Sequence, residues 1–172
     1  MNGVALTARR LAGYGIDVTA LAVVLIPIAT IVSLVLGNEG LSGIQVWMRS
    51  LVLISIPAWT YFVVTEHRWG AGLGKRLTGL RTVAMAADAP PSWGAALART
   101  AVTLAPWELI HLAFFGLAQQ LGEVTSGQVV VATVAYVLMA AYVVVTLRTG
   151  GRRSPADLLA RTEVRRRQPE RA

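Results

Sequence analysis

Cysteine is absent from this sequence, and histidine occurs only at His67 and His111. The absence of cysteine excludes disulfide bridges, thiolate-bound zinc or iron–sulfur centres and thiol catalysis. With so few histidines, the sequence contains no Ser-His-Asp arrangement and no other nucleophile with a recognisable base. The chain is therefore not expected to be an enzyme, and nothing in it indicates a cofactor.

Charged residues are also scarce. They make up 15% of the 172 residues, against 55% for hydrophobic residues, which is far from the composition of a water-soluble domain. The apolar residues occur in long runs, and the short stretches between the runs hold most of the arginine, glycine and proline. This pattern predicts membrane spans and not a water-soluble core.

Four apolar runs are long enough to cross a hydrocarbon core of about 30 Å, which takes about 20 helical residues. They predict an all-α, polytopic membrane protein with four transmembrane helices in a single domain, residues 1–164. The spans are expected at about 12–36, 46–65, 101–119 and 128–147. Residues 165–172 are too basic to enter lipid and are expected to form a flexible tail.

The basic residues predict the orientation of these spans. Of the 16 Lys and Arg residues, all except Arg49 lie in the N-terminal segment, in the loop 66–100 or after the last span. Because cytoplasmic segments are enriched in Lys and Arg, both termini and the loop are expected in the cytoplasm. The net charge of +7 indicates contacts with anionic lipids and not with nucleic acid, since the basic residues flank apolar spans.

The cytoplasmic loop carries the pattern of an interfacial helix. Its apolar residues follow helical spacing, with basic residues on the other faces, as in a helix that lies on a membrane surface. The apolar positions are Leu73, Leu77, Leu80 and Val83. The basic residues, for which we expect contacts with lipid headgroups or within the loop, are Lys75, Arg76 and Arg81.

Two acidic residues lie near the inner ends of the spans. Arg10 and Asp17 share one face of a helix that begins before Arg10, about 10.5 Å apart along its axis. That separation is long for a direct salt bridge. Asp17 is explained either as an interfacial acid neutralised by arginines or as a functional group. In the tail, Ser154, Pro155 and Asp157 predict a helix start with a capping box, with Asp157 facing arginines at the inner surface.

The third span carries Glu108 and His111, three residues apart on one helical face. Ionisable groups at that depth cost about 2.5–3.5 kcal/mol on insertion scales and usually mark a pathway. The pair is explained either as an ion or proton site or as an interhelical hydrogen-bond pair. A di-iron centre would need a second Glu-x-x-His pair and two further glutamates, so no metal is expected.

Three blocks of the sequence resemble the signature blocks of the RDD family of bacterial membrane proteins. They are RRLAGYGID, GLGKRLTGLRTV and SPADLLARTEV, and they occur in the family order. The resemblance implies that the arginine and two aspartates after which the family is named are Arg10, Asp17 and Asp157. It implies that these residues form a charged cluster near the cytoplasmic face. Ala156 and Arg161 depart from the family pattern of His and Gly, which argues against a histidine-dependent role in the tail.

The resemblance also implies a multi-pass protein of the plasma (inner) membrane of a bacterium, with relatives proposed as monovalent cation/proton antiporters or other transporters. We expect a small transporter or ion-coupled carrier in which Glu108, with His111 nearby, titrates. Asp17 is expected to form a second ion-binding position near the inner membrane surface. Four helices are too few to enclose a transport pathway, so a homo-oligomer is expected. The alternative is a non-transporting accessory or assembly subunit that binds lipid or a membrane partner.

Overall fold

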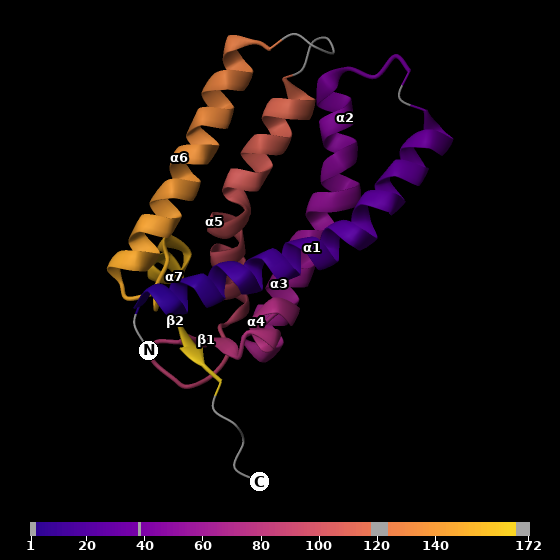
Figure 1. The fold of residues 1–172 in the computed structure, drawn as a ribbon. Coiled ribbons are helices and arrows are strands. Elements are labelled where there is room, and N and C mark those ends of the chain that lie inside the picture. The colour runs from indigo at the N-terminus through magenta and orange to yellow at the C-terminus, as the bar shows by residue number, and fades with distance from the viewer. Residues whose placement is uncertain (1–2, 38, 118–123, 168–172) are drawn as a thin grey trace.

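The computed structural model describes residues 3–37, 39–117 and 124–167. Helical rods dominate the fold, and a small sheet with two short helices closes one end of them (Figure 1). The end of the third predicted span, at 118–119, lies outside the described residues. The last residues of the predicted tail, 168–172, also lie outside them.

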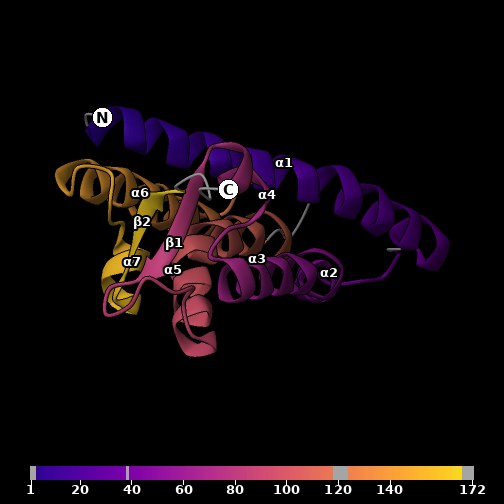
Figure 2. The same cartoon turned by 90° about the horizontal axis from the view of Figure 1, so that it is seen from below.

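The first helix, α1 (Gly3–Leu36), has 34 residues and is therefore about 51 Å long. It runs obliquely across the other rods in Figure 1 and along one side of them in Figure 2. It begins well before the predicted span at 12–36, so Arg10 lies inside the helix. An oblique course accommodates the extra length, since a helix of this size exceeds a hydrocarbon core of about 30 Å.

The second rod combines α2 (Gly43–Ser50), the π-helical segment η1 (Leu51–Ser55) and α3 (Ile56–Trp69). A capping box between Ser42 and Gln45 begins it. Pro57 has no amide hydrogen to donate into the preceding turn, and that turn is π-helical. Gly70 ends the rod with a φ of 65°.

The third rod combines α5 (Trp93–His111) and the π-helical segment η2 (Leu112–Gly116), and it packs against both α3 and α6. Ser92 caps its start by accepting a hydrogen bond from the amide of Ala95. The last rod, α6 (Ser126–Arg148), begins with a capping box between Thr125 and Gln128.

Within the described residues, three helices are long and apolar enough to cross a membrane. They are α1, the second rod over Gly43–Trp69, and α6. The prediction of four spans counts the third rod as well, which carries Arg99, Glu108 and His111.

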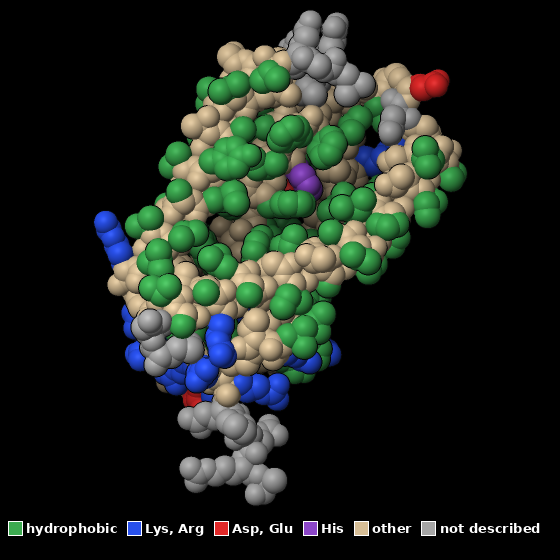
Figure 3. Space-filling view, in the orientation of Figure 1, with side chains coloured by type: hydrophobic (Ala, Val, Ile, Leu, Met, Phe, Trp, Pro, Cys, Tyr) green, Lys and Arg blue, Asp and Glu red, His purple; other side chains and the backbone are tan. Residues whose placement is uncertain are grey.

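The end of the rods holds α4 (Leu73–Leu77), β1 (Leu80–Ala84), α7 (Pro155–Ala160) and β2 (Thr162–Arg166). The two strands pair antiparallel, with Leu80 opposite Arg166 and Thr82 opposite Val164. We call this part of the molecule the charged end, because most of the visible Lys and Arg side chains gather there, whereas apolar side chains are spread over the rest of the visible face (Figure 3).

The strands correct the sequence-based prediction of an all-α fold. The helical spacing predicted for 73–83 holds only as far as Leu77, because Gly79 adopts a φ of 69° and turns the chain. Leu80 and Val83 belong to β1. The partner strand β2 includes Arg165 and Arg166, although residues 165–172 were expected to form a flexible tail. Leu80 and Val164 pack with Leu6 of α1 in a buried cluster.

Candidate functional site

A chain of ion pairs runs through the charged end, and Arg99 of α5 lies at its centre. The Arg99 Nε donates to a Glu66 oxygen at 2.6 Å, and its Nη1 pairs with Asp157 and donates to Thr162 at 2.7 Å. Lys75 pairs with the other oxygen of Glu66. With Arg10 bound to Asp157, these residues form what we call the charged network, whose five members come from α4, α3, α5, α7 and α1: Lys75, Glu66, Arg99, Asp157 and Arg10.

Arg10 joins the first helix to the segment that follows α6. Its Nη2 lies 2.5 Å from an oxygen of Asp157, while Nη1 donates to the carbonyls of Gly151 and Arg152 at 3.1 and 3.0 Å. The planar, multi-donor guanidinium fits this task, because one ammonium group could not reach a carboxylate and two carbonyls in fixed geometry.

Asp157 is fully buried at the start of α7. It accepts hydrogen bonds from the backbone amide and hydroxyl of Ser154 at 2.7 and 2.6 Å, which confirms the predicted capping box. Burial by itself would raise the pKa of Asp157. The opposing effects of Arg99, Arg10 and Ser154 are larger, so the pKa is held well below its usual range and the carboxylate stays charged.

Asp17 lies apart from this network. One of its oxygens, Oδ1, accepts hydrogen bonds from the Tyr61 hydroxyl at 2.5 Å and from the Gly74 amide at 2.9 Å. Tyr61 in turn accepts a hydrogen bond from the Leu73 amide at 2.7 Å. The structure therefore pairs Arg10 with Asp157, whereas the hydrogen bonds of Asp17 go to Tyr61 and Gly74.

Two glycines make this position of Asp17 possible. A Cβ on Gly74 would overlap the carbonyl oxygen of Gly13, and a Cβ on Gly13 would lie 3.2 Å from the Gly74 carbonyl. The backbones of α1 and α4 therefore approach one another as only glycine permits. Gly13 in the first sequence block and Gly74 in the second therefore set the distance between the two helices.

Glu108 lies farther along α5, half-buried against the second rod. It accepts hydrogen bonds from the Ser55 hydroxyl at 3.0 Å and from the Trp59 indole nitrogen at 3.1 Å. His111 is 8% exposed and packs between the rings of Trp107 and Phe115. Within the described residues, the Nδ1 of His111 has no hydrogen-bond partner, and the two hydrogen bonds of Glu108 go to the second rod and not to His111.

Two cavities lie along α1. The charged-end cavity, of about 480 Å³, is bordered by four members of the charged network and by Asp17. The second, of about 520 Å³, extends toward the opposite half of the rods, and we call it the Arg49 cavity. Both cavities are lined by a shared layer of side chains from α1, α3 and α5: Tyr14, Val18, Phe62 and Trp107. Tyr14 and Phe62 stack at a centroid distance of 6.2 Å in this layer.

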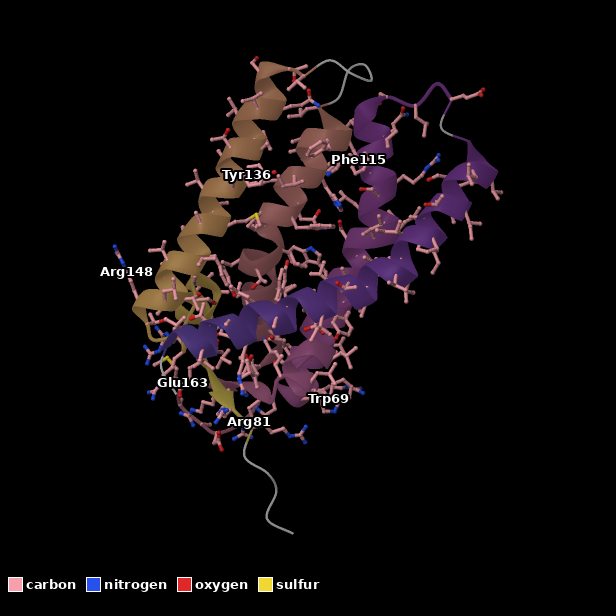
Figure 4. The ribbon with its side chains drawn as sticks, viewed as in Figure 1. Trp69, Arg81, Phe115, Tyr136, Arg148 and Glu163 are labelled. Atoms are coloured by element: carbon pink, nitrogen blue, oxygen red, sulfur yellow. The ribbon has the colours of Figure 1, made fainter. Side chains whose placement is uncertain are left out.

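The three basic loop residues have different environments. Lys75 is drawn into the charged network by Glu66. The Arg76 guanidinium lies 4.5 Å from the ring centroid of Trp69, and Arg81 pairs with Asp88 at 2.5 Å. Figure 4 shows Trp69 and Arg81 at the charged end, with Phe115 in the opposite half of the molecule.

Sequence reasoning missed Glu66 and Arg99 as members of the site. Both are ionisable residues placed at the boundary of an apolar run, which is the signal that could have identified them. The position of Glu66 or Arg99 at such a boundary does not predict which residue it pairs with, because the pairing depends on how α3, α5 and α7 pack. No group of three or more His, Asp or Glu residues in the described chain is arranged to hold a metal ion.

A family model described as the RDD family matches residues 4–161, which is nearly the whole chain. No curated protein and no solved structure matches the chain. The family match includes both partners of the Arg10–Asp157 ion pair and the close approach of α1 to α4.

Proposed function

The chain belongs to the RDD family, and from that premise we propose that it is a small ion-coupled carrier of the bacterial plasma membrane. In this proposal the third rod also crosses the membrane, which gives four crossings in total, and both termini lie in the cytoplasm. The coupling ion is a monovalent cation or a proton. The carrier works as a homo-oligomer, since four rods are too few to enclose a pathway alone.

The distribution of charge supports this orientation. The charged end collects arginines from the N-terminal helix, the loop and the tail (Figure 3). Arg49 is the exception, and it lies at the end of α2, in the opposite half of the second rod. Since positive residues are retained on the cytoplasmic side, the charged end faces the cytoplasm.

The environment of Glu108 is the observation that carries the proposal. Glu66 and Asp157 are paired with Lys or Arg, so their charges are already compensated. Glu108 receives neutral donors, a hydroxyl and an indole, and no Lys or Arg in the described chain pairs with it. A carboxyl group inside an apolar rod pair, with only neutral hydrogen-bond donors around it, is suited to bind a mobile cation.

Asp17, at the charged end, resembles Glu108 because, among the described residues, it also accepts hydrogen bonds only from neutral donors. Its donors are the Tyr61 hydroxyl and the Gly74 amide, which are also neutral. It borders the charged-end cavity, and the shared layer around Phe62 separates that cavity from the one beyond. Two acids with only neutral hydrogen-bond donors in the described chain, Asp17 near the charged end and Glu108 farther along the rods, are suited to successive binding of one ion.

The proposal is tested by ion flux in proteoliposomes. The wild-type protein is expected to couple proton movement to a gradient of sodium or potassium, and Glu108→Gln is expected to abolish it. Asp88→Asn is the matched control, because it makes the same type of change, acid to amide, at an exposed residue. Undiminished flux in Glu108→Gln, or equal loss in Asp88→Asn, would contradict the proposal.

A second candidate function is a non-transporting subunit that binds membrane lipids or a membrane partner. The observation that favours it is a group of exposed arginines at the charged end: Arg68, Arg76, Arg152, Arg161, Arg165, Arg166 and Arg167. These side chains can contact anionic headgroups. This candidate predicts no flux in the wild-type protein and a stoichiometric partner after purification in mild detergent.

A further inference from the structure

The Arg49 cavity has the shape and polarity of a site for an amphiphile. It lies between α1, the second rod and α5, and its volume of about 520 Å³ is in the range of about 300–1,000 Å³ found for small-ligand sites. Its walls are mainly apolar, with polar groups at the end near Arg49, Ser50 and His111. We propose that this cavity binds an anionic amphiphile, a molecule with a carboxylate or phosphate head and an alkyl tail.

The packing of the second and third rods places the polar groups at one depth. A Cβ on Gly116 would lie 3.5 Å from the Cβ of Trp47, and Ser55 hydrogen-bonds Glu108. The two rods run antiparallel between these contacts, so Ser50 and His111 lie within about one helical turn of each other. A single head group can therefore contact residues from both rods.

Two of these side chains have polar atoms without a partner. The Ser50 hydroxyl and the His111 Nδ1 are buried and make no hydrogen bond within the described residues. Buried polar atoms are nearly always paired, because an unpaired one loses its interaction with water and gains nothing in return. A ligand with acceptor oxygens would supply the missing partners.

The charge of the cavity selects an anion. None of the described residues that line it is Asp or Glu, whereas Arg49 is a permanent cation. Arg49 also donates to the Gly37 carbonyl at 2.7 Å, which holds the guanidinium at the edge of the cavity. The charged-end cavity differs, since it has acids as well as bases in its wall.

The tail of the amphiphile lies along α1. The apolar wall continues from the Arg49 end to the shared layer and includes Leu21, Leu25, Ala29 and Leu53. The hollow above α1 in Figure 3 is bordered by apolar side chains, and Phe115 is in this half of the molecule in Figure 4. Binding of an amphiphile at this site does not depend on the proposed carrier function. Only the identification of the amphiphile as the cargo of the carrier rests on that function.

The test measures binding to the full chain in nanodiscs of phosphatidylcholine, without any ion gradient. The probe is dibrominated stearate, whose bromine atoms quench tryptophan, because Trp107 lines the cavity. Dibrominated stearyl alcohol is the uncharged comparison. We expect saturable quenching, with stearate bound about tenfold more tightly than the alcohol, as one lost charged hydrogen bond implies. An alkaline pH keeps the carboxylic acid ionised.

Three substitutions locate the site. Arg49→Gln is expected to weaken stearate binding about tenfold, and Arg49→Lys to retain most of it, since the charge is kept. Arg148→Gln is the matched control, because Arg148 is exposed on α6 (Figure 4). If Arg49→Gln does not fold, Ala29→Phe keeps every polar group, fills the cavity and is expected to remove binding of both probes.

Equal affinity for stearate and the alcohol would overturn the proposal, as would equal weakening by Arg49→Gln and Arg148→Gln or full binding by Ala29→Phe. Competition by phosphatidylglycerol added to the nanodiscs would support the site and identify a bilayer lipid as the source of the anion. Selective binding without that competition would support the site with a free fatty acid as its ligand. Absence of ion flux would contradict the carrier proposal and leave this binding result intact.

Discussion

Arg10 and Asp157 are separated by 147 positions in the chain and form a buried ion pair with an N–O distance of 2.5 Å. The pair joins the N-terminal helix to the short helix that follows the last rod. Asp157 also pairs with Arg99, so the carboxylate links three segments that are distant in sequence. Asp157 thereby connects α1, α5 and α7, and the contribution of each residue to stability can be tested separately.

Replacing Arg10 is expected to destabilise the protein. In Arg10→Gln, the buried Asp157 loses one of its two cations, and the Gly151 and Arg152 carbonyls lose a donor. Breaking a buried pair in this way costs about 3 kcal/mol, which thermal unfolding in detergent would detect. Arg148→Gln, an exposed change of the same type, is expected to shift stability by less than about 0.5 kcal/mol. Equal unfolding temperatures for the two variants would contradict this prediction.

A conservative change at Arg99 is also expected to be costly. The Nε and Nη1 of Arg99 contact Glu66 and Asp157 separately, and the compact ammonium of Arg99→Lys reaches only one carboxylate. A loss of about 1.5–3 kcal/mol is expected, as for one charged hydrogen bond. Arg81→Lys is the control, because its exposed partner Asp88 makes the pair worth about 0–1 kcal/mol. The prediction fails if both lysine variants unfold alike.

The lowered pKa of Asp157 predicts an acid-sensitive fold. Its pKa in the folded protein lies below the unfolded value of about 3.9, so folding favours the charged carboxylate. The resulting stabilisation is complete above about pH 4 and is lost as the pH falls toward the folded-state pKa. The unfolding temperature in detergent is therefore expected to decrease steadily below about pH 4. An unfolding temperature that stays constant from about pH 4 to 2 would be inconsistent with this linkage.

The close approach of α1 and α4 predicts a position-dependent effect of alanine. Gly74→Ala places a methyl group on the carbonyl oxygen of Gly13 and so separates the two helices. The Gly74 amide then moves away from Asp17. A loss of about 1–3 kcal/mol is expected from this overpacking. Gly15→Ala is the control, because no atom lies within 4 Å of its added Cβ, and it is expected to leave stability unchanged or slightly higher.

The helical part of the fold was largely predictable from hydropathy. The apolar runs at 12–36, 46–65 and 128–147 correspond to helices long and apolar enough to span a membrane. Helix starts were predictable where a cap is local, as Ser154 and Asp157 demonstrate. The family resemblance rested on three short blocks and is confirmed over residues 4–161.

The strand pair was not predictable in the same way. Leu77 and Leu80 fit helical spacing, and a five-residue segment such as β1 is too short for periodicity to distinguish helix from strand. What decides the conformation is the partner strand β2, whose Arg166 lies opposite Leu80 although it is 86 positions farther along the chain. Local sequence contains no information about that partner.

The candidate site shows the same division. Arg10, Asp17 and Asp157 were identified from the blocks, but the blocks did not indicate that Asp17 binds Tyr61 and Gly74 while Arg10 binds Asp157. The predicted separation of about 10.5 Å between Arg10 and Asp17 along one helix agrees with their different partners. Arg99 and Glu66 could not be assigned to the network from the sequence, because their pairing depends on how the rods pack.

The sequence by itself determined which segments are apolar, where helices are capped, and on which segments the cations lie, because these depend on residues close in the chain. Only the tertiary structure decided which charges pair, how β1 and β2 align, and where the two cavities open. Those features depend on contacts between residues as distant as Arg10 and Asp157, and the geometry of such contacts arises only when the rods pack against one another.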